Sequence, residues 1–286
     1  MPEPKEKEAP QPLKASVVVV SCNRIELLRR CLTALELSEA REQMEIIVVD
    51  NGSTDGSAQL EDEFRGATFI RIPRNFGLTK AMNLGLRAAQ GSYVLFLHED
   101  TEVSPDTVRE LAAKLDADPE LGAVAPMLVT ARGNPAPQVG RFPPDGTWRP
   151  VFDAGQAGMP ENPQPVAVDY ARGAVLMVRK FFLQAMREID ERYGQFGSDA
   201  DLCFQMRRAG KRILILPNLR TVHHGGADSA LKQADLRAGI AGWTSKYYGM
   251  FAGFKARVAA ALGALIRLHF SEMGHILAGQ KIDGTQ

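Results

Sequence analysis

The first half of the chain alternates between short apolar runs and longer segments with apolar residues at helical spacing. The apolar runs cover 16–21, 45–50, 67–72 and 92–97, and helical patterns cover 24–37, 57–65 and 78–90. Buried apolar strands separated by helices are typical of a parallel, doubly wound sheet. We therefore expect an α/β fold with a mostly parallel central sheet flanked by helices.

Later segments continue the pattern less regularly. Regular structure is expected over 165–179, in helices near 180–189 and 199–209, and in a strand at 212–217. From 250 to 280, residues such as Phe251, Phe254 and Leu262 recur at steps of three or four, which predicts one amphipathic helix. Two interpretations of this helix stay open: packing on the protein's own core or a dimer partner, and docking on an anionic membrane surface.

Composition narrows the class of protein. Among 286 residues, 34 are Lys or Arg and 34 are Asp or Glu, so charge gives no support for a nucleic-acid partner. Three widely spaced cysteines argue against a disulfide framework and favour a reducing compartment. The charged, proline-rich residues 1–14 predict a disordered leader rather than a signal peptide, and no apolar run is long enough to span a membrane. We expect a cytoplasmic protein.

Polar, turn-forming residues follow each of the first four predicted strands. They are "SCNR" (21–24), "DNGSTDGS" (50–57), "PRNFG" (73–77) and "HEDT" (98–101). Each segment alone is ordinary loop chemistry. In a doubly wound sheet, however, ligands bind outside the carboxyl ends of the strands, so the four together predict one crevice. Neither a dinucleotide-binding GxGxxG nor a P-loop motif is present.

Four longer segments carry a resemblance to a known family: "SVVVVSCNR", "IIVVDNGSTDGS", "NFGLTKAMNLGLRAAQGSYVLFLHEDTEV" and "GSDADLCFQMRRAGKRILILPNLRTVHHGG". In this order they resemble the inverting GT-A glycosyltransferases of family 2, including bacterial rhamnosyltransferase-like and cell-surface polysaccharide enzymes. The resemblance implies a GT-A domain over 15–226, with a nucleotide-binding half at 15–130 and an acceptor half at 131–226. A C-terminal helical extension would occupy 227–286. We interpret the Pro- and Gly-rich segment 131–165 as a lid or an acceptor-side excursion.

The resemblance also implies roles for individual residues. A UDP-, dTDP- or GDP-linked sugar donor would be bound by Ser21, Asn23, Arg24, Asp50, Asn75, Gly77, Asn83 and Glu99. Mn²⁺ or Mg²⁺ would be bound by Asp100 and His223, with His98 and His224 as further candidates. Asp199 would be the catalytic base, with Asp201 as the alternative. The acceptor would be a saccharide or lipid-linked hydroxyl, in surface-polysaccharide or glycolipid assembly at the inner face of the cell membrane.

General chemistry supports these roles. A divalent cation between carboxylate and phosphate oxygens stabilises a departing diphosphate, and a histidine ligand favours Mn²⁺. A carboxylate can deprotonate the acceptor hydroxyl. For Asp199 a structural interpretation also stays open, because Ser198 and Asp201 match the S-x-x-[DE] capping box at a helix start.

Three positions depart from the family pattern. Ser198 stands where the family usually has an acidic residue before the catalytic aspartate. The metal motif reads His98-Glu99-Asp100, where the family more often has further aspartates, or an asparagine and a proline. Met82 stands where many members have a polar or basic residue. These departures keep open the alternative of a nucleotide-sugar-binding protein without transfer activity. A nucleotidyltransferase is a weaker alternative, since "SCNRIELLRR" provides no Gly-rich triphosphate loop.

Overall fold

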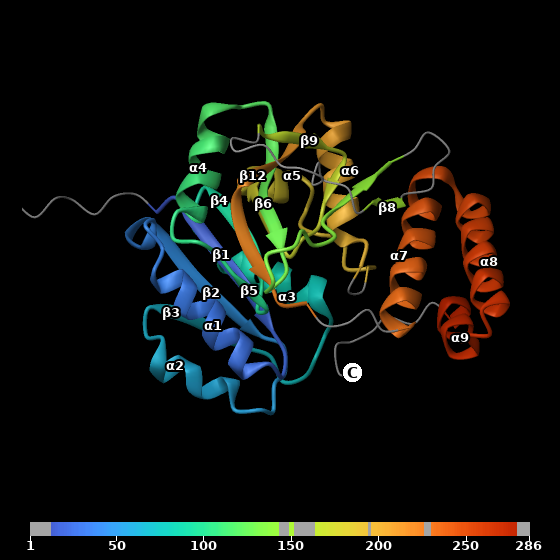
Figure 1. Ribbon diagram of the computed structural model, residues 1–286, viewed down its shortest axis with the longest axis horizontal. Coiled ribbons are helices and arrows are strands. Elements are labelled where there is room, and N and C mark those ends of the chain that lie inside the picture. Colours follow the sequence, from blue (N-terminus) through green and yellow to red (C-terminus); the bar gives the residue numbers. More distant parts are fainter. Residues whose placement is uncertain (1–12, 143–148, 152–163, 194–195, 226–229, 279–286) are drawn as a thin grey trace, which may run out of the picture.

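The computed structural model describes residues 13–142, 149–151, 164–193, 196–225 and 230–278. These residues form a layered α/β body, with a group of three helices from the C-terminal part of the chain at one end (Figure 1). Most of the expected leader (1–14) and much of the expected lid (131–165) lie outside the described residues.

The first four long strands are parallel, as the sequence predicts. They are β1 (Ala15–Ser21), β2 (Met44–Asp50), β3 (Ala67–Arg71) and β4 (Tyr93–His98), in the spatial order β3-β2-β1-β4. Valine and isoleucine favour this conformation because their branched side chains pack well on a pleated surface. The register places Ser21 beside Asp50 and Val20 beside His98. The polar segments that follow these strands therefore lie at one edge of the sheet.

Helices cover both faces of these strands (Figure 1). They are α1 (Ile25–Glu36), α2 (Leu60–Glu63), α3 (Leu78–Ala88) and α4 (Thr107–Ala117), with 3₁₀ turns at Arg41–Gln43 and Ser57–Gln59. Val18 and Val20 share a buried cluster with α3, whereas Val17 and Val19 share one with α1 and α4. Because successive strand residues face opposite sides, each strand contributes to both cores.

The rest of the sheet adds antiparallel strands. β11 (Val175–Arg179) lies between β4 and β6 (Leu121–Val129) and is antiparallel to both, while β12 (Arg212–His223) is parallel to β6. β5 (Thr101–Glu102) and β9 (Val166–Val168) pair with opposite ends of β12. A small second sheet has the order β10 (Tyr170–Ala171), β7 (Val139–Arg141), β8 (Arg149–Val151). The helices α5 (Lys180–Ala185) and α6 (Ser198–Arg208) complete the body.

The C-terminal region contains more helices than the sequence predicts. α7 (Ala230–Tyr248) is followed by α8 (Met250–Ile266) and α9 (Phe270–Ala278), so the prediction of one helix over 250–280 is wrong. Leu268 has φ +59, outside the α-helical range, and there the chain turns so that α9 packs against α7 and α8. Trp243 of α7 is fully buried against Phe142 and Phe204 of the body. None of the described helices is long and apolar enough to cross a membrane.

Candidate active site

The loops that follow β1 and β2 hold each other through polar side chains. Asn23 Oδ1 accepts the N–H of Thr54 at 2.7 Å, and the N–H of Asn23 donates to Ser53 Oγ at 3.0 Å. Asp55 Oδ2 accepts the N–H of Ile25, the first residue of α1, at 2.8 Å. These contacts fix Asn23 at φ +54, a left-handed conformation that asparagine tolerates better than most residues.

Ser21 and Asp50 lie at the ends of neighbouring strands, and both are buried. Asp50 Oδ1 accepts the N–H of Ser53 at 2.9 Å. Ser21 Oγ has no hydrogen-bond partner among the described residues. Because an unpaired buried hydroxyl is costly, Ser21 is a suitable contact for a bound group.

The loop after β3 is held against the loop after β2. Asn51 Nδ2 donates to Asn75 Oδ1 at 2.9 Å, and the same oxygen accepts the N–H of Gly77, the residue just before α3, at 2.8 Å. Gly52 has φ +79, and a Cβ added there would lie 2.5 Å from the carbonyl carbon of Arg74. The close approach of these two loops therefore requires glycine at position 52.

Three residues of metal-binding types converge at the end of β4. The ligand atoms of His98, Asp100 and His223 all lie within 4.8 Å of one another. Asp100 Oδ1 lies 3.3 Å from His223 Nε2, and it is buried without a well-aligned hydrogen bond from any described residue. His223 reaches this position because the antiparallel pairing of β12 and β5 sets it opposite Thr101.

The protonation states of this cluster suit a divalent cation. Burial lowers the pKa of His98 to about 4, so its imidazole is neutral at physiological pH. Burial acts to raise the pKa of Asp100, but contact with His223 and the charge of Arg24 outweigh it and hold that pKa well below its ordinary value. A neutral imidazole and an ionised carboxylate are the forms that bind metals, so the residues present fit Mn²⁺ or Mg²⁺.

Arg24 places a permanent cation beside the same cluster. Its Nη1 donates to Asp100 Oδ2 at 3.0 Å, and its Nε lies 3.7 Å from Glu99 Oε1. His224 faces elsewhere: its Nε2 lies 2.6 Å from Glu102 Oε1. The structure therefore brings Arg24 and Glu99 to the edge of the cluster and leaves His224 outside it.

Asp199 lies in the first turn of α6 and faces the small second sheet. Its Oδ2 accepts the hydroxyl of Tyr170 at 2.8 Å and the N–H of Gly173 at 3.0 Å. The next residue, Ala174, accepts the N–H of His98 at 2.9 Å through its carbonyl. The consecutive residues 173 and 174 thus connect the Asp199 carboxylate to the cluster at the end of β4.

Asp201, the alternative base, is occupied by structural contacts. It is 1% exposed, and its two oxygens lie 2.8 and 2.9 Å from Lys246 Nζ of α7, while Tyr193 also donates its hydroxyl at 3.2 Å. The predicted capping box does not form: Gly197 precedes α6, and no side chain caps the helix. Asp201 pairs with α7 instead of reaching back to Ser198.

Asn83 is also fully engaged within the protein. Its Nδ2 donates to the carbonyl of Ile189 at 2.9 Å, and its Oδ1 accepts the N–H of Ile189 at 3.0 Å. A further bond joins Nδ2 to Glu191 Oε1 at 3.1 Å. These contacts fasten α3 to the segment after α5 and favour a structural role over the predicted contact with a donor.

Three residues of the site are absent from the sequence-based prediction: Asn51, Asp55 and Tyr170. Asn51 and Asp55 stand inside the "DNGSTDGS" segment, and Tyr170 begins "YARGAV". Each of the three residues therefore lies in a segment that the sequence already marks as polar or pocket-forming. Spacing alone does not tell which polar side chains in such segments face one another.

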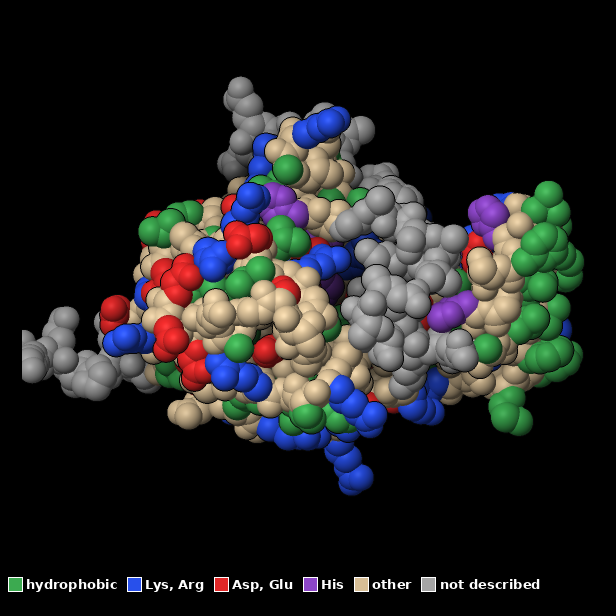
Figure 2. Space-filling view, turned by 90° about the horizontal axis from the view of Figure 1, so that it is seen from below, with side chains coloured by type: hydrophobic (Ala, Val, Ile, Leu, Met, Phe, Trp, Pro, Cys, Tyr) green, Lys and Arg blue, Asp and Glu red, His purple; other side chains and the backbone are tan. Residues whose placement is uncertain are grey.

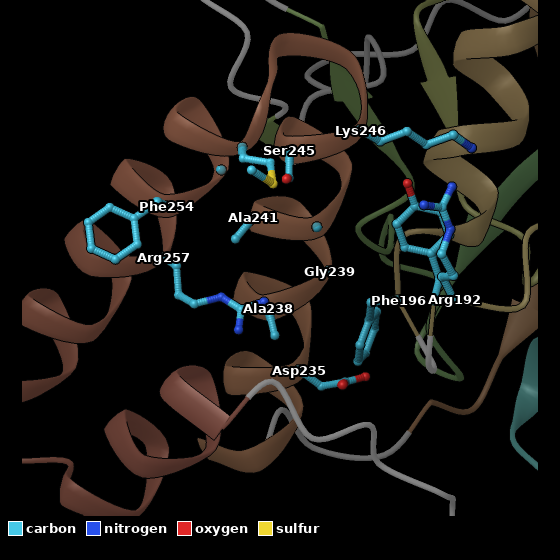
Figure 3. Close-up of a pocket in the computed structure, with 14 residues that line it drawn as sticks. Arg192, Phe196, Asp235, Ala238, Gly239, Ala241, Ser245, Lys246, Phe254 and Arg257 are labelled. Atoms are coloured by element: carbon cyan, nitrogen blue, oxygen red, sulfur yellow. The ribbon is translucent and has the colours of Figure 1, made fainter.

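A groove of about 670 Å³ lies between α7, α8 and the segment before α6 (Figure 3). Phe196 and Arg192 lie on one side of it, and Phe254 and Arg257 of α8 lie on the other. Phe196 stands just before Gly197 and α6. One wall of the groove is therefore the segment that leads directly to Asp199.

The sequence is similar to those of known proteins. Residues 16–175 match the model of the family Glycosyl transferase family 2. The chain is 24% identical over 235 residues to the N-acetylglucosaminyl-diphospho-decaprenol L-rhamnosyltransferase of Mycobacterium tuberculosis, covering 73% of this chain and 75% of that protein. It is 35% identical over 99 residues to the uncharacterized glycosyltransferase YfnE of Bacillus subtilis, which is 34% of this chain and only 25% of the relative.

Solved structures show the same fold. A mannosyltransferase from Pyrobaculum calidifontis, in complex with GDP-Man and Mn²⁺, has a TM-score of 0.61 at 17% identity, covering 94% of this chain and 86% of that chain. GalNAc-T7 with UDP, GalNAc and Mn²⁺ has a TM-score of 0.62 at 18% identity, covering 80% of this chain and 48% of that chain. These similarities establish the GT-A fold. Because the family model covers more than half of its residues, the chain belongs to glycosyl transferase family 2.

Proposed function

We propose that this chain is an inverting glycosyltransferase. It moves a sugar from a nucleoside-diphosphate donor to the hydroxyl of a saccharide or lipid-linked acceptor. Family membership supports the reaction class, and the relatives solved with UDP or GDP-Man support a nucleotide-linked donor. Neither family membership nor these solved structures identify the nucleobase or the sugar of the donor.

One observation carries the proposal: a carboxylate and a cation-binding cluster are joined through two consecutive residues. Gly173 donates its N–H to Asp199, while the carbonyl of Ala174 accepts the N–H of His98. A transferase needs a base for the acceptor and positive charge for the leaving diphosphate, separated by about the width of one sugar. The consecutive residues 173 and 174 hold the carboxylate and the cluster in a set relation to each other, which serves the orientation that such a transfer requires.

In the proposed mechanism, Asp199 takes the proton of the acceptor hydroxyl. The acceptor oxygen then attacks the anomeric carbon from the face opposite the nucleoside diphosphate, so the configuration inverts as the anomeric carbon–phosphate oxygen bond breaks. Tyr170 and Gly173 orient the carboxylate by donating to one of its oxygens.

The leaving diphosphate gains negative charge, and two groups would stabilise it. Arg24 supplies a fixed cation beside Asp100. When Mn²⁺ or Mg²⁺ is bound, held by Asp100 and His223 with His98, it would act as a Lewis acid toward the phosphate oxygens. Ser21 and the loop 50–57 would contact the nucleoside part, consistent with the unpaired hydroxyl of Ser21.

For the biological setting, we propose the assembly of surface polysaccharide or glycolipid. The relative in Mycobacterium tuberculosis is named for an acceptor attached to a diphospho-decaprenol, and another relative, in Myxococcus xanthus, is an O-antigen biosynthesis protein. An acceptor of either kind presents the sugar hydroxyl that Asp199 would deprotonate.

Calorimetry and turnover together test the proposal. The chain is titrated with UDP-, GDP- and dTDP-sugars with and without Mn²⁺, and slow hydrolysis of the bound donor is followed. We expect Asp199→Asn to bind the donor as tightly as the parent but to lose roughly a hundredfold to ten-thousandfold of the turnover. Asp100→Asn should instead abolish the effect of Mn²⁺ on donor binding.

Asp62→Asn, an exposed carboxylate of α2, is the matched control and should change neither quantity. Full turnover by Asp199→Asn would refute the role of Asp199. Donor binding without turnover by the parent on any acceptor would favour the alternative, a nucleotide-sugar-binding protein without transfer activity.

A further inference from the structure

The helix α8 buries small side chains and exposes large ones. Its buried residues are Gly253, Ala261 and Ala264, which lie against the other C-terminal helices. A Cβ added to Gly253 would lie 2.8 Å from the Cα of Ser245 and 2.9 Å from the carbonyl oxygen of Ala241 in α7, so this contact requires glycine. The usual pattern of a surface helix, with large apolar residues inward, is therefore reversed.

The outward face forms a continuous apolar surface, which we name the α8–α9 face. Its exposed members are Met250 (84%), Phe251 (70%), Phe254 (63%), Leu262 (52%), Leu265 (40%), Ile266 (82%), Leu268 (73%), Phe270 (60%) and Leu277 (51%). At 100° per residue, 251, 254, 262, 265 and 266 share one side of α8. Figure 2 shows apolar side chains along the outer side of the C-terminal helices. An exposed apolar patch of this extent marks an interaction site.

The charges around this face have one sign. Residues 250–278 contain Lys255, Arg257 and Arg267 but a single acidic residue, Glu272. Glu272 is 2% exposed and is paired with Arg237, so it presents no negative charge to the surroundings. Lys255 Nζ lies 4.5 Å from the centre of the Phe251 ring, on the apolar side of α8 itself. A basic side chain among exposed apolar ones is complementary to an anionic surface with an apolar interior.

The α8–α9 face is fixed relative to the catalytic residues. Trp243 of α7 is buried in the body, and Lys246 of α7 pairs with Asp201, two residues after Asp199. Phe254 belongs to this face and also to the wall of the groove that leads toward the start of α6. A surface bound to the α8–α9 face would therefore lie at a set orientation to Asp199.

We propose that the α8–α9 face docks on the surface of an anionic lipid bilayer, without spanning it. The apolar side chains enter the boundary of the acyl chains, and Lys255 and Arg267 meet the lipid head groups. A second copy of the chain is a poorer occupant, because a symmetric interface pairs this face with itself, and the face carries cations while the acidic residue of 250–278 is buried. The proposal concerns membrane binding alone and is tested without the transfer reaction.

Vesicle co-sedimentation tests it directly. The full chain is mixed with vesicles of phosphatidylcholine alone and with vesicles of equal parts phosphatidylcholine and phosphatidylglycerol. We expect the parent to sediment with the anionic vesicles and less with the neutral ones, with partial loss at high salt. The triple variant Phe251→Asp, Leu262→Asp, Ile266→Asp should bind the anionic vesicles at least about tenfold more weakly. Each apolar side chain that enters the bilayer contributes favourably to the free energy of membrane binding.

Two further variants make the test decisive. Leu37→Asp replaces an equally exposed leucine (68%) at the end of α1 and should bind as the parent does. Lys255→Glu leaves the apolar residues in place and should weaken binding to the anionic vesicles by about fivefold or more while leaving neutral vesicles unchanged. Circular dichroism of each variant confirms that the fold is kept.

A parent chain that stays in solution with both vesicle types would overturn the proposal, as would unchanged binding by the triple variant. Sedimentation velocity without vesicles addresses the second copy. A dimer that the triple variant converts to a monomer would assign the α8–α9 face to self-association and would also overturn membrane docking.

Discussion

Two carboxylates in the first turn of α6 have opposite surroundings although one residue separates them. Asp199 is partly exposed, and one of its oxygens accepts a hydrogen bond from a phenol and another from a backbone N–H. Asp201 is buried with the ammonium of Lys246 against both oxygens. A proton can reach the first from outside, whereas the second is committed to holding α7, so the two have different roles.

We predict that Tyr170→Phe lowers kcat about tenfold or more. The hydroxyl of Tyr170 donates to Asp199 Oδ2 at 2.8 Å, and a hydrogen bond to a charged group contributes about 1.5–3 kcal/mol. Burial and the charge of Asp199 raise the pKa of Tyr170 well above 10.0, so the phenol remains a donor throughout the neutral range. Both kcat and the affinity for the donor are measured for the variant and the parent. We expect kcat to fall and the affinity for the donor to stay the same.

The matched control is Tyr247→Phe, which removes a hydroxyl that donates to Asp201 at 2.7 Å. It should lower the free energy of unfolding without the same loss of kcat. Equal loss of kcat in both variants would mean that Tyr170 acts through stability rather than through Asp199.

At the residue scale, the sequence predicts which motif residues belong to the site and that Asp100 lies near His223, but it does not predict the partners of Asp201 and Asn83. The family resemblance implies both the role of Asp199 and the pairing of Asp100 with His223. Asp201 pairs with Lys246, which lies 45 positions later in the chain, and Asn83 bonds to Ile189, which lies 106 positions later. Spacing contains no information on such distant pairs, so it could not show that these two polar groups are already satisfied.

Among the elements, the loops after β2 and β3 depend on one close backbone approach. We predict that Gly52→Ala lowers both the free energy of unfolding and donor affinity, because its Cβ would meet the backbone of Arg74 at 2.5 Å. The loop 73–77 would have to move, and Asn75 with it. Urea unfolding and calorimetry with a nucleotide donor measure the two effects.

Gly133→Ala separates steric contact from backbone strain. Gly133 has the same φ of +79, yet an added Cβ would meet nothing within 4 Å. We expect it to cost only about 1 kcal/mol, the strain of a left-handed residue, and to leave donor affinity unchanged. Similar effects at both glycines would show that the approach to Arg74 is unimportant.

The pattern of apolar residues predicted the strands better than the C-terminal helices. Runs such as 16–21 are extended because they pack on both faces, and β1 is buried along its whole length. In 250–280 the same three- and four-residue steps continue across the break at Leu268, so they could not reveal it. The same steps also predict that the large apolar residues of this segment face the core, whereas the buried residues of α8 include Gly253 and Ala261.

On the scale of the whole molecule, buried phenols make the fold sensitive to alkaline pH. Burial is the main cause that raises the pKa of Tyr93, Tyr170, Tyr193 and Tyr247. For Tyr93 the pKa rises from 10.0 to about 12. Because the pKa of Tyr93 is raised in the folded state, its phenol loses the proton first in the unfolded chain. Its contribution to the free energy of unfolding is therefore complete below pH 10.0 and is lost as the pH rises toward about 12.

We therefore predict that the free energy of unfolding falls as the pH rises above about 10. Buried Cys31 and Cys203 add a loss of the same sign, which begins near their ordinary value of 9.0. Urea titrations across this range measure the slope, and Tyr93→Phe should make it shallower. A flat profile across the range would contradict the prediction.

The pairing of β12 with β5 has a consequence for the order in which the protein matures. His223 meets Asp100 through this pairing, and more than a hundred residues separate them along the chain. During synthesis, Asp100 and the loops after β1, β2 and β3 leave the ribosome long before His223 is made. Contacts between such distant positions form late in folding because a long loop must close first. Tight cation binding at this cluster would therefore report a completed fold, and a nascent chain that ends before β12 would lack it.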